Sequence, residues 1–259
     1  MRLIWRARRD PPVEDSVNVN QQQPSYYPEA GTGTAAASVA ERAKFIERTY
    51  LHLAGAIAAF VALEFVFLSL APMQKLGIAM LSSRAGWFLV LALFIGVSWM
   101  ADRFARHSTS RPMQYLGLGL YVLAEAVIFI PLLMLAQIYG GPDVIMTAGV
   151  STLAIFAALT GIVMVTKKDF SWMRGALAIL SLGALGLIAF SLLFGFSLGI
   201  FFVVFMIALS ACYILYDTSN IMRHYHPQAY VAAALTLFAS VALMFWYILQ
   251  FVMSMTSRD

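Results

Sequence analysis

The 259-residue chain is 61% hydrophobic and only 12% charged, with a mean hydropathy of +0.79. A water-soluble domain would be about half apolar and about a quarter charged, so this composition excludes a soluble fold and indicates a chain that spans lipid. The net charge of +4 does not indicate nucleic-acid binding, because the basic residues lie between apolar blocks and form no continuous patch. The single cysteine, Cys212, excludes an internal disulfide.

The first forty residues predict a separate segment. Four arginines occupy the first nine positions and no apolar stretch follows them, so we expect no cleavable signal peptide. Residues 10–40 are rich in Pro, Gln, Gly, Ser and Ala. We therefore interpret residues 1–40 as a disordered cytoplasmic tail and residues 41–259 as the membrane domain.

Seven apolar blocks follow, each near the ~20 residues that a helix needs to cross a bilayer. Short breaks separate them, and they are marked by Pro72, Arg111-Pro112, Gly140-Gly141-Pro142, Lys167-Lys168-Asp169, Gly195 and His226-Pro227. The expected spans are 48–71, 85–104, 113–134, 143–165, 175–194, 197–217 and 231–254. A tight turn at Gly195 must divide the fifth span from the sixth, because one helix across both would be about twice the bilayer thickness. The aromatic residues of the last span are interpreted as lipid contacts and interfacial anchors; they are Phe245, Trp246, Tyr247 and Phe251.

Positive charge predicts the orientation of these spans. Fourteen of the seventeen Lys and Arg residues fall on the side of the N-terminus and three on the other side. Since cytoplasmic segments are enriched in Lys and Arg, we expect the N-terminus inside and the C-terminus outside. The predicted fold is an all-α bundle of seven transmembrane helices, with the lipid bilayer as its partner.

Three acidic residues are expected at membrane depth: Glu64 in the first span, Glu125 in the third, and Asp217 at the inner end of the sixth. Each costs about 2.5–3.5 kcal/mol on insertion scales, so each should face the bundle interior or water. The alternative to a functional site differs between them. It is a protonated, hydrogen-bonded carboxyl at Glu64, a packed carboxyl at Glu125, and an interfacial acid in contact with water at Asp217.

No catalytic motif accompanies these acids. The sequence holds no Ser-His-Asp order, no Gly-rich phosphate loop and no zinc-binding helix motif, so we expect neither enzymatic activity nor a cofactor. His224 and His226 lie two residues apart on an expected loop without nearby carboxylates, and make a poor metal site.

Two segments resemble motifs of the Bax inhibitor-1 family, also called the transmembrane Bax inhibitor motif family. Residues 47–53 (ERTYLHL) resemble the start of its first helix, and residues 213–218 (YILYDT) resemble its sixth-helix signature. Glu125 falls where the family often carries a third-helix acid. The short loops and the final Ser-Arg-Asp look like the bacterial YccA branch. The motif positions are Thr49, Tyr50, His52, Tyr216 and Thr218.

The resemblance implies six helices around a central seventh, in a bacterial inner membrane, and a pH-sensitive calcium leak governed by two aspartates. Asp217 matches the first aspartate, whereas Ser240 stands in the place of the second. A serine adds an oxygen but no charge, so a calcium ion at Asp217 should be weakly bound, because calcium takes six to eight oxygens. Arg103 or Arg106 is expected to latch Asp217, as an arginine is thought to do in relatives.

Two functions are open at this point. The first is a leak or carrier for calcium or protons, with Asp217, Glu125 and Glu64 on the path. The second is a non-conducting modulator of a membrane-bound AAA protease, which the YccA branch looks like and which the N-terminal tail would serve. Neither hypothesis specifies an oligomeric state.

Overall fold

A computed structural model describes residues 38–107 and 110–256. These residues form helices and no strand, which confirms the all-helical class. Within this described part, five helical segments are long and apolar enough to cross a membrane: α1, α4, Ser171–Phe194, α6 and α7. In chain order the elements are α1 (Val39–Ser69), α2 (Ala71–Ser82), α3 (Arg84–His107), α4 (Arg111–Thr166), the short 3-10 helix η2 (Ser171–Met173), α5 (Arg174–Phe194), α6 (Gly199–Arg223) and α7 (Tyr230–Thr256).

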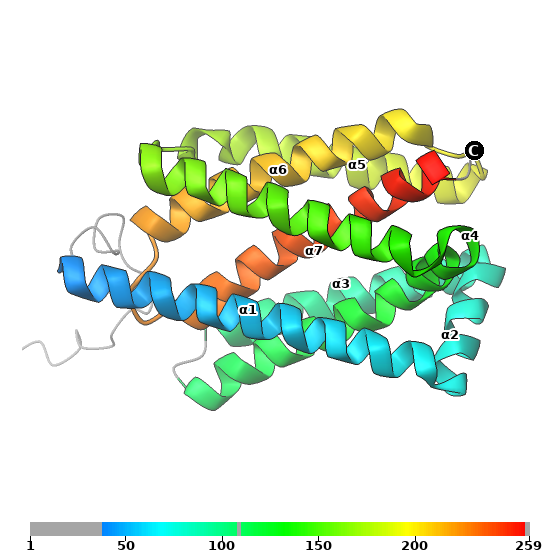
Figure 1. Cartoon of the computed structure of the whole chain (residues 1–259), viewed down its shortest axis with the longest axis horizontal. Coiled ribbons are helices and arrows are strands. Elements are labelled where there is room, and N and C mark those ends of the chain that lie inside the picture. The colour runs from blue at the N-terminus through cyan, green and yellow to red at the C-terminus, as the bar shows by residue number, and fades with distance from the viewer. Residues whose placement is uncertain (1–37, 108–109, 257–259) are drawn as a thin grey trace, which may run out of the picture.

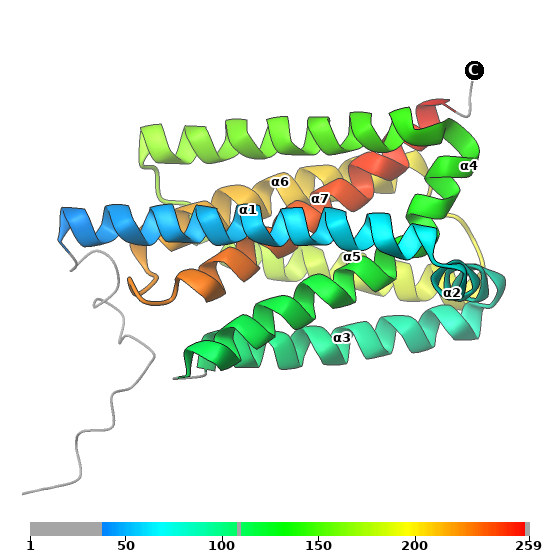
Figure 2. The same cartoon turned by 60° about the horizontal axis from the view of Figure 1, so that its bottom comes forward.

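The long helices lie roughly along one axis, so that the connections gather at two ends (Figures 1 and 2). One end holds the start of α1, the end of α3, the start of α4, and the connections from α4 to α5 and from α6 to α7; we call it the N-terminal end of the bundle. The other end holds α2, the α5–α6 connection and the last turns of α7; we call it the C-terminal end.

A break divides α4 into two halves at Gly141, where φ is 67° and ψ is −172°. Glycine adopts this positive φ without the steric cost that a side chain would bring. Pro142 follows, and proline is well suited to the first turn of a helix because it needs no N–H partner there. The second half turns back toward the N-terminal end, as Figure 2 shows. A second expected break is found at Gly195, which ends α5 with φ 75°.

Two boundaries differ from the sequence prediction. α1 begins at Val39, nine residues before the expected start, because Ser38 and Glu41 form a capping box in which each side chain accepts the other's backbone N–H at 3.2 and 3.0 Å. Pro72 was expected in a break, but it lies in the first turn of α2, a twelve-residue helix. Residues 1–37 of the tail expected at residues 1–40 lie outside the described residues.

The last helix, α7, is the most buried of the membrane-length helices: 72% of its most apolar window is buried, against 22% for α1. It contacts α1, α3, α4 and α6. The ring of Phe245 stacks on Phe129 with centroids 5.5 Å apart, Trp246 meets Phe129 edge-on at 4.9 Å, and Tyr247 is only 6% exposed. The interpretation of these three aromatic residues as lipid contacts is therefore wrong, because α7 lies inside the bundle and its rings fill the core.

Candidate functional site

The three membrane acids lie between helices and away from lipid. Glu64, Glu125 and Asp217 are 5%, 7% and 6% exposed. A carboxylate facing hydrocarbon is costly, whereas one inside the bundle can be surrounded by polar groups or water.

Asp217 on α6 is joined directly to Ser240 on α7. The Ser240 hydroxyl donates a hydrogen bond to Asp217 Oδ2 over 2.5 Å, and both side chains are buried. A hydroxyl–carboxylate bond of this length is typical of charge-assisted pairs, which are stronger than neutral ones. This hydrogen bond ties α6 to α7, and the correspondence of Ser240 to the second aspartate of the family stays a prediction.

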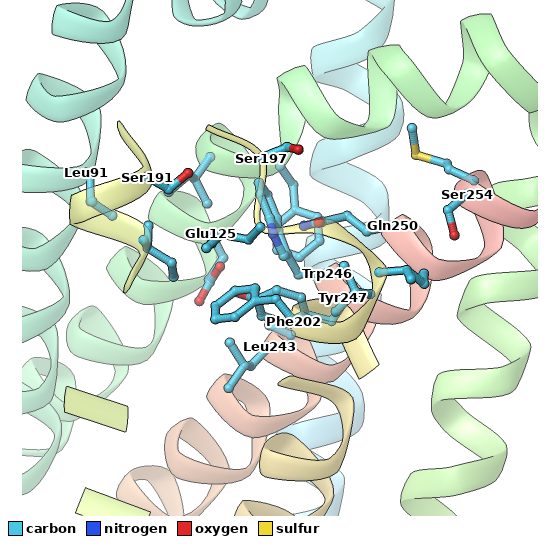
Figure 3. Close-up of a pocket in the computed structure, with 18 of the residues that line it drawn as sticks. Leu91, Glu125, Ser191, Ser197, Phe202, Leu243, Trp246, Tyr247, Gln250 and Ser254 are labelled. Carbon is cyan, nitrogen blue, oxygen red and sulfur yellow. The ribbon is translucent and has the colours of Figure 1, made fainter. Parts of the chain in front are cut away.

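A cavity of about 1060 Å³ has Ser240 and Glu125 in its lining and reaches the C-terminal end of the bundle (Figure 3). Its lining continues along α7 to Ser254, which is a rise of about 21 Å from Ser240. At its far end it is lined by Ser197 of the α5–α6 connection and by Tyr139 beside the α4 break. The cavity therefore follows the C-terminal half of α7.

Glu125 is the acidic residue of the cavity lining. Tyr121, one helical turn earlier, hydrogen bonds with its carboxyl group. Figure 3 shows Glu125 beside the space that Trp246, Tyr247 and Gln250 also border. Tyr121 was not anticipated from the sequence, although a tyrosine four residues before a buried acid on a helix is a usable signal.

Packed apolar side chains close the bundle on the N-terminal side of Ser240. From Val231 to Phe238 every residue except Thr236 is 3% exposed or less. The cavity therefore ends at the level of Ser240, and dense packing lies between that level and the N-terminal end.

Glu64 on α1 is not in the cavity lining. Both its carboxylate oxygens are buried, and neither has a hydrogen-bond partner within the described part of the chain. Its charge interacts with that of Glu125, so the two groups are within electrostatic range. The structure therefore brings Asp217, Ser240 and Glu125 to one region and places Glu64 beside it.

Two motif residues meet in a buried cluster of hydroxyl groups. The hydroxyls of Tyr50 on α1, Thr160 on α4 and Thr218 on α6 are buried, and among the described residues none has a partner with good hydrogen-bond geometry. Tyr50 nevertheless interacts with both threonines, so the cluster joins three helices. Thr49 donates to a backbone oxygen one turn earlier at 2.9 Å, and Tyr216 packs in a separate apolar cluster with Tyr247. Thr160 was not anticipated, since its position on another helix gives no pattern in the sequence.

The two arginines expected to latch Asp217 are placed differently. Arg103 lies over the ring of Trp99, with its Cζ 5.7 Å from the ring centroid. The side chain of Arg106 lies outside the described residues. A latch at Asp217 stays a prediction.

Metal-ligating side chains are sparse in the part of the chain that the structure describes. No three His, Cys, Asp or Glu residues there lie close enough to hold a metal ion together. Asp217 and Ser240 offer three side-chain oxygens, fewer than the six to eight that calcium takes.

Comparison with known proteins identifies relatives across most of the chain. The profile of the family described as inhibitor of apoptosis-promoting Bax1 matches residues 42–258. Protein lifeguard 4 of Mus musculus is 26% identical over 88% of this chain and 92% of its own length. Bax inhibitor 1 of Schizosaccharomyces pombe is 29% identical over 67% of this chain and 64% of its own. An uncharacterised protein of Pasteurella multocida is 30% identical over 61% of this chain and 70% of its own.

Proposed function

Since the chain belongs to the Bax inhibitor-1 family and is a multi-pass membrane protein, we propose that it is a pH-responsive leak or carrier for cations with its gate at Asp217. The observation that carries this proposal is the hydrogen bond from Ser240 to Asp217 at the closed end of the cavity. A cavity that reaches one end of a bundle and stops at a serine bonded to a buried carboxylate is half of a pathway. The packed half of α7 is the part that must move.

The proposed pathway crosses a bundle of seven spans. We count the two halves of α4 as two spans, because the chain turns back at Gly141. Together with α3 and the four other membrane-length helical segments they make seven, and α7 lies at the centre. Lys167, Lys168 and Arg223 lie at the N-terminal end, which supports our proposal, by the positive-inside rule, that this end faces the cytoplasm. The membrane that we propose is a bacterial inner membrane. The C-terminus and the cavity then face outward, and Asp217 closes the path toward the cytoplasm.

The charge of Asp217 gives the gate its pH response. An ionised carboxylate accepts a strong, charge-assisted bond from Ser240 and holds α6 against α7. Protonation removes the charge and leaves a neutral bond of about half the strength. We therefore expect the pathway to open more often as the pH falls.

The cavity favours cations, and its chemistry favours protons over calcium. The carboxylate of Glu125 creates a negative electrostatic potential inside a low-dielectric cavity, and this potential raises the local concentration of cations. At the gate, the serine hydroxyl supplies no second charge for a divalent ion. We therefore propose proton movement as the main activity, with calcium weakly handled.

A flux assay tests this proposal. The full chain is reconstituted into vesicles that contain a calcium dye or a proton dye, and wild type is compared with Ser240→Asp, Ser240→Asn and protein-free vesicles. We expect wild type to carry protons faster at acidic pH, and Ser240→Asp, which restores a second acid, to gain calcium flux that Ser240→Asn does not gain. Flux equal to that of protein-free vesicles in both arms would contradict the proposal.

Orientation has its own test. In a Cys212→Ser background, a cysteine at Lys168 should react with a membrane-impermeant maleimide only from the cytoplasmic side, and a cysteine at Lys75 only from outside. The reverse pattern would overturn the proposed topology.

Modulation of a membrane-bound AAA protease is the alternative function that we propose. It is motivated by the N-terminal tail at residues 1–40, most of which lies outside the described residues. Deleting residues 1–37 tests it: loss of co-purification with the protease and a longer half-life in cells would support it. An unchanged half-life and unchanged co-purification would count against it.

A further inference from the structure

A second cavity, of about 580 Å³, forms a groove between α1 and the first half of α4. The small residues Gly55, Ala59 and Gly119 leave room for it. Leu51 at one end is 68% exposed, so the groove lies on the outer surface of the bundle, where lipid would be. From Leu51 to Leu63 at the other end, α1 rises about 18 Å, close to the ~15 Å of one hydrocarbon leaflet.

The groove has a polar end built from His52 and Tyr115. His52 Nδ1 lies 2.7 Å from the backbone oxygen of Arg48, and its Nε2 lies 2.9 Å from the Tyr115 hydroxyl. Because a carbonyl oxygen can only accept, Nδ1 is the donor in the first bond. The imidazole also packs against the rings of Tyr115 and Tyr230, at 5.5 and 4.9 Å between centroids. The side chains at this end are therefore held in place before any ligand arrives.

Two arginines flank the polar end. Arg48 and Arg111 lie over the ring of Tyr230, with Cζ atoms 5.6 and 4.8 Å from its centroid. Arg111 also donates to the backbone oxygen of Gln228 at 2.8 Å. Within the described residues no carboxylate forms an ion pair with either guanidinium. An apolar groove of leaflet length thus begins at two positive charges, for which residues 38–107 and 110–256 supply no carboxylate partner.

We propose that this groove binds one anionic glycerophospholipid, whose phosphate lies at Arg48 and Arg111 and one of whose two acyl chains lies between α1 and α4. The guanidinium group matches the geometry of phosphate oxygens. Arginines at the end of a membrane helix lie at the depth of lipid headgroups, where they attract anionic lipids. A zwitterionic lipid offers the same acyl chains, but its headgroup also carries a positive charge, which the two arginines would repel.

A second copy of the chain is the competing occupant, because small residues on a helix surface also permit close helix packing. Two copies related by an axis normal to the membrane would place Arg48 and Arg111 of both copies at the same depth. That arrangement brings like charges together, whereas an anionic lipid neutralises them. Charge complementarity therefore favours the lipid.

Native mass spectrometry of the full chain in detergent micelles, with added phosphatidylglycerol or phosphatidylcholine, tests the proposal. Gly119→Leu would fill the groove, and the Cβ atom that it adds meets no neighbouring atom within 4 Å, so we expect the fold to tolerate it. Gly183→Leu on α5 is the matched control, since that site is equally open. Gly55→Leu, also unobstructed, replaces Gly119→Leu if thermal unfolding shows that the latter is not folded.

We expect wild type to retain one phosphatidylglycerol at least tenfold more strongly than phosphatidylcholine. Gly119→Leu should lower this retention at least tenfold, and Gly183→Leu should leave it unchanged. Equal retention by Gly119→Leu and wild type would overturn the proposal, as would a dimer that Gly119→Leu converts to a monomer while lipid binding stays the same.

Charge variants test the headgroup contact separately. Arg48→Gln/Arg111→Gln should abolish the preference for phosphatidylglycerol over phosphatidylcholine. Lys168→Gln/Arg174→Gln removes the same charge at the same end of the bundle and should preserve the preference. If both double variants change it equally, general surface charge explains the binding and the proposed site is wrong.

Discussion

Replacing Ser240 with alanine tests the role of the hydroxyl in keeping the pathway closed. The substitution removes the 2.5 Å bond to Asp217 and little else, because alanine fits where serine fits. Interhelical hydrogen bonds in membranes contribute about 0.6 kcal/mol on average, and about 1.7 at most, while bonds to charged groups in proteins contribute about 1.5–3 kcal/mol. We take about 1.5 kcal/mol, where the two ranges meet, which is roughly tenfold in an equilibrium between closed and open forms.

The expected result is a proton flux at neutral pH roughly tenfold above that of wild type, measured in vesicles with equal amounts of protein. Ser210→Ala is the matched control. Ser210 on α6 is buried like Ser240, but its hydroxyl donates to the backbone oxygen of Ile207 in the same helix, so no interhelical bond is lost. An unchanged or reduced flux in a folded Ser240→Ala protein would refute the reasoning, because the bond would then not hold the gate closed.

Three further predictions concern packing and the α4–α5 connection. Gly77→Ala places a methyl group 2.7 Å from the nearest side-chain atom of α4, so it should destabilise the protein by about 1–3 kcal/mol in detergent unfolding, whereas Gly55→Ala, with open space around it, should not; equal stability of the two would contradict this. Phe129→Ala removes three ring contacts with centroids 4.9–5.5 Å apart, which are worth about 1 kcal/mol each, so we expect the free energy of unfolding to fall by about 3 kcal/mol in the same assay. A much smaller fall would mean that the core relaxes around the gap. The Ser171 hydroxyl, together with its backbone N–H, donates to the Asp169 carboxylate and holds the pKa of Asp169 below its ordinary value, so this contact stabilises the fold at pH values above that ordinary value and is lost as pH falls through the lowered pKa. Ser171→Ala should raise this pKa toward its ordinary value in a carboxyl NMR titration, and an unchanged pKa would show that another group is responsible.

The sequence predicts the helical breaks because their chemistry is local. Gly141 and Gly195 take positive φ values that a side chain disfavours, so each marks an interruption wherever the chain folds. The burial of Asp217 is likewise predictable, since a carboxylate in an apolar helix cannot remain in lipid.

Hydropathy alone misplaces elements that are helical but not strongly apolar. The first turns of α1 are polar, and the signal for them is the Ser38–Glu41 capping box, which the expected spans ignored. Pro72 was treated as a breaker, whereas proline is compatible with the first turn of a helix. These two errors share one cause, which is that a span prediction weighs lipid affinity and not helix initiation.

Contacts between helices are the part that the sequence did not predict. From the sequence alone the aromatic residues of α7 are typical of lipid anchors. Phe245 and Tyr247 are core residues only because α7 lies inside the bundle. The meeting of Tyr50 with Thr160 and Thr218 depends in the same way on how three helices pack, which no periodicity within one helix encodes.

The most direct test of the central claim compares proton flux through wild type and Asp217→Asn in vesicles of the same lipid and protein content, over a range of pH. Asparagine preserves the size of the side chain and removes the titrating charge. If Asp217 is the gate, the variant should lose the acceleration that acid produces in wild type. Identical pH profiles for the two proteins would contradict the account.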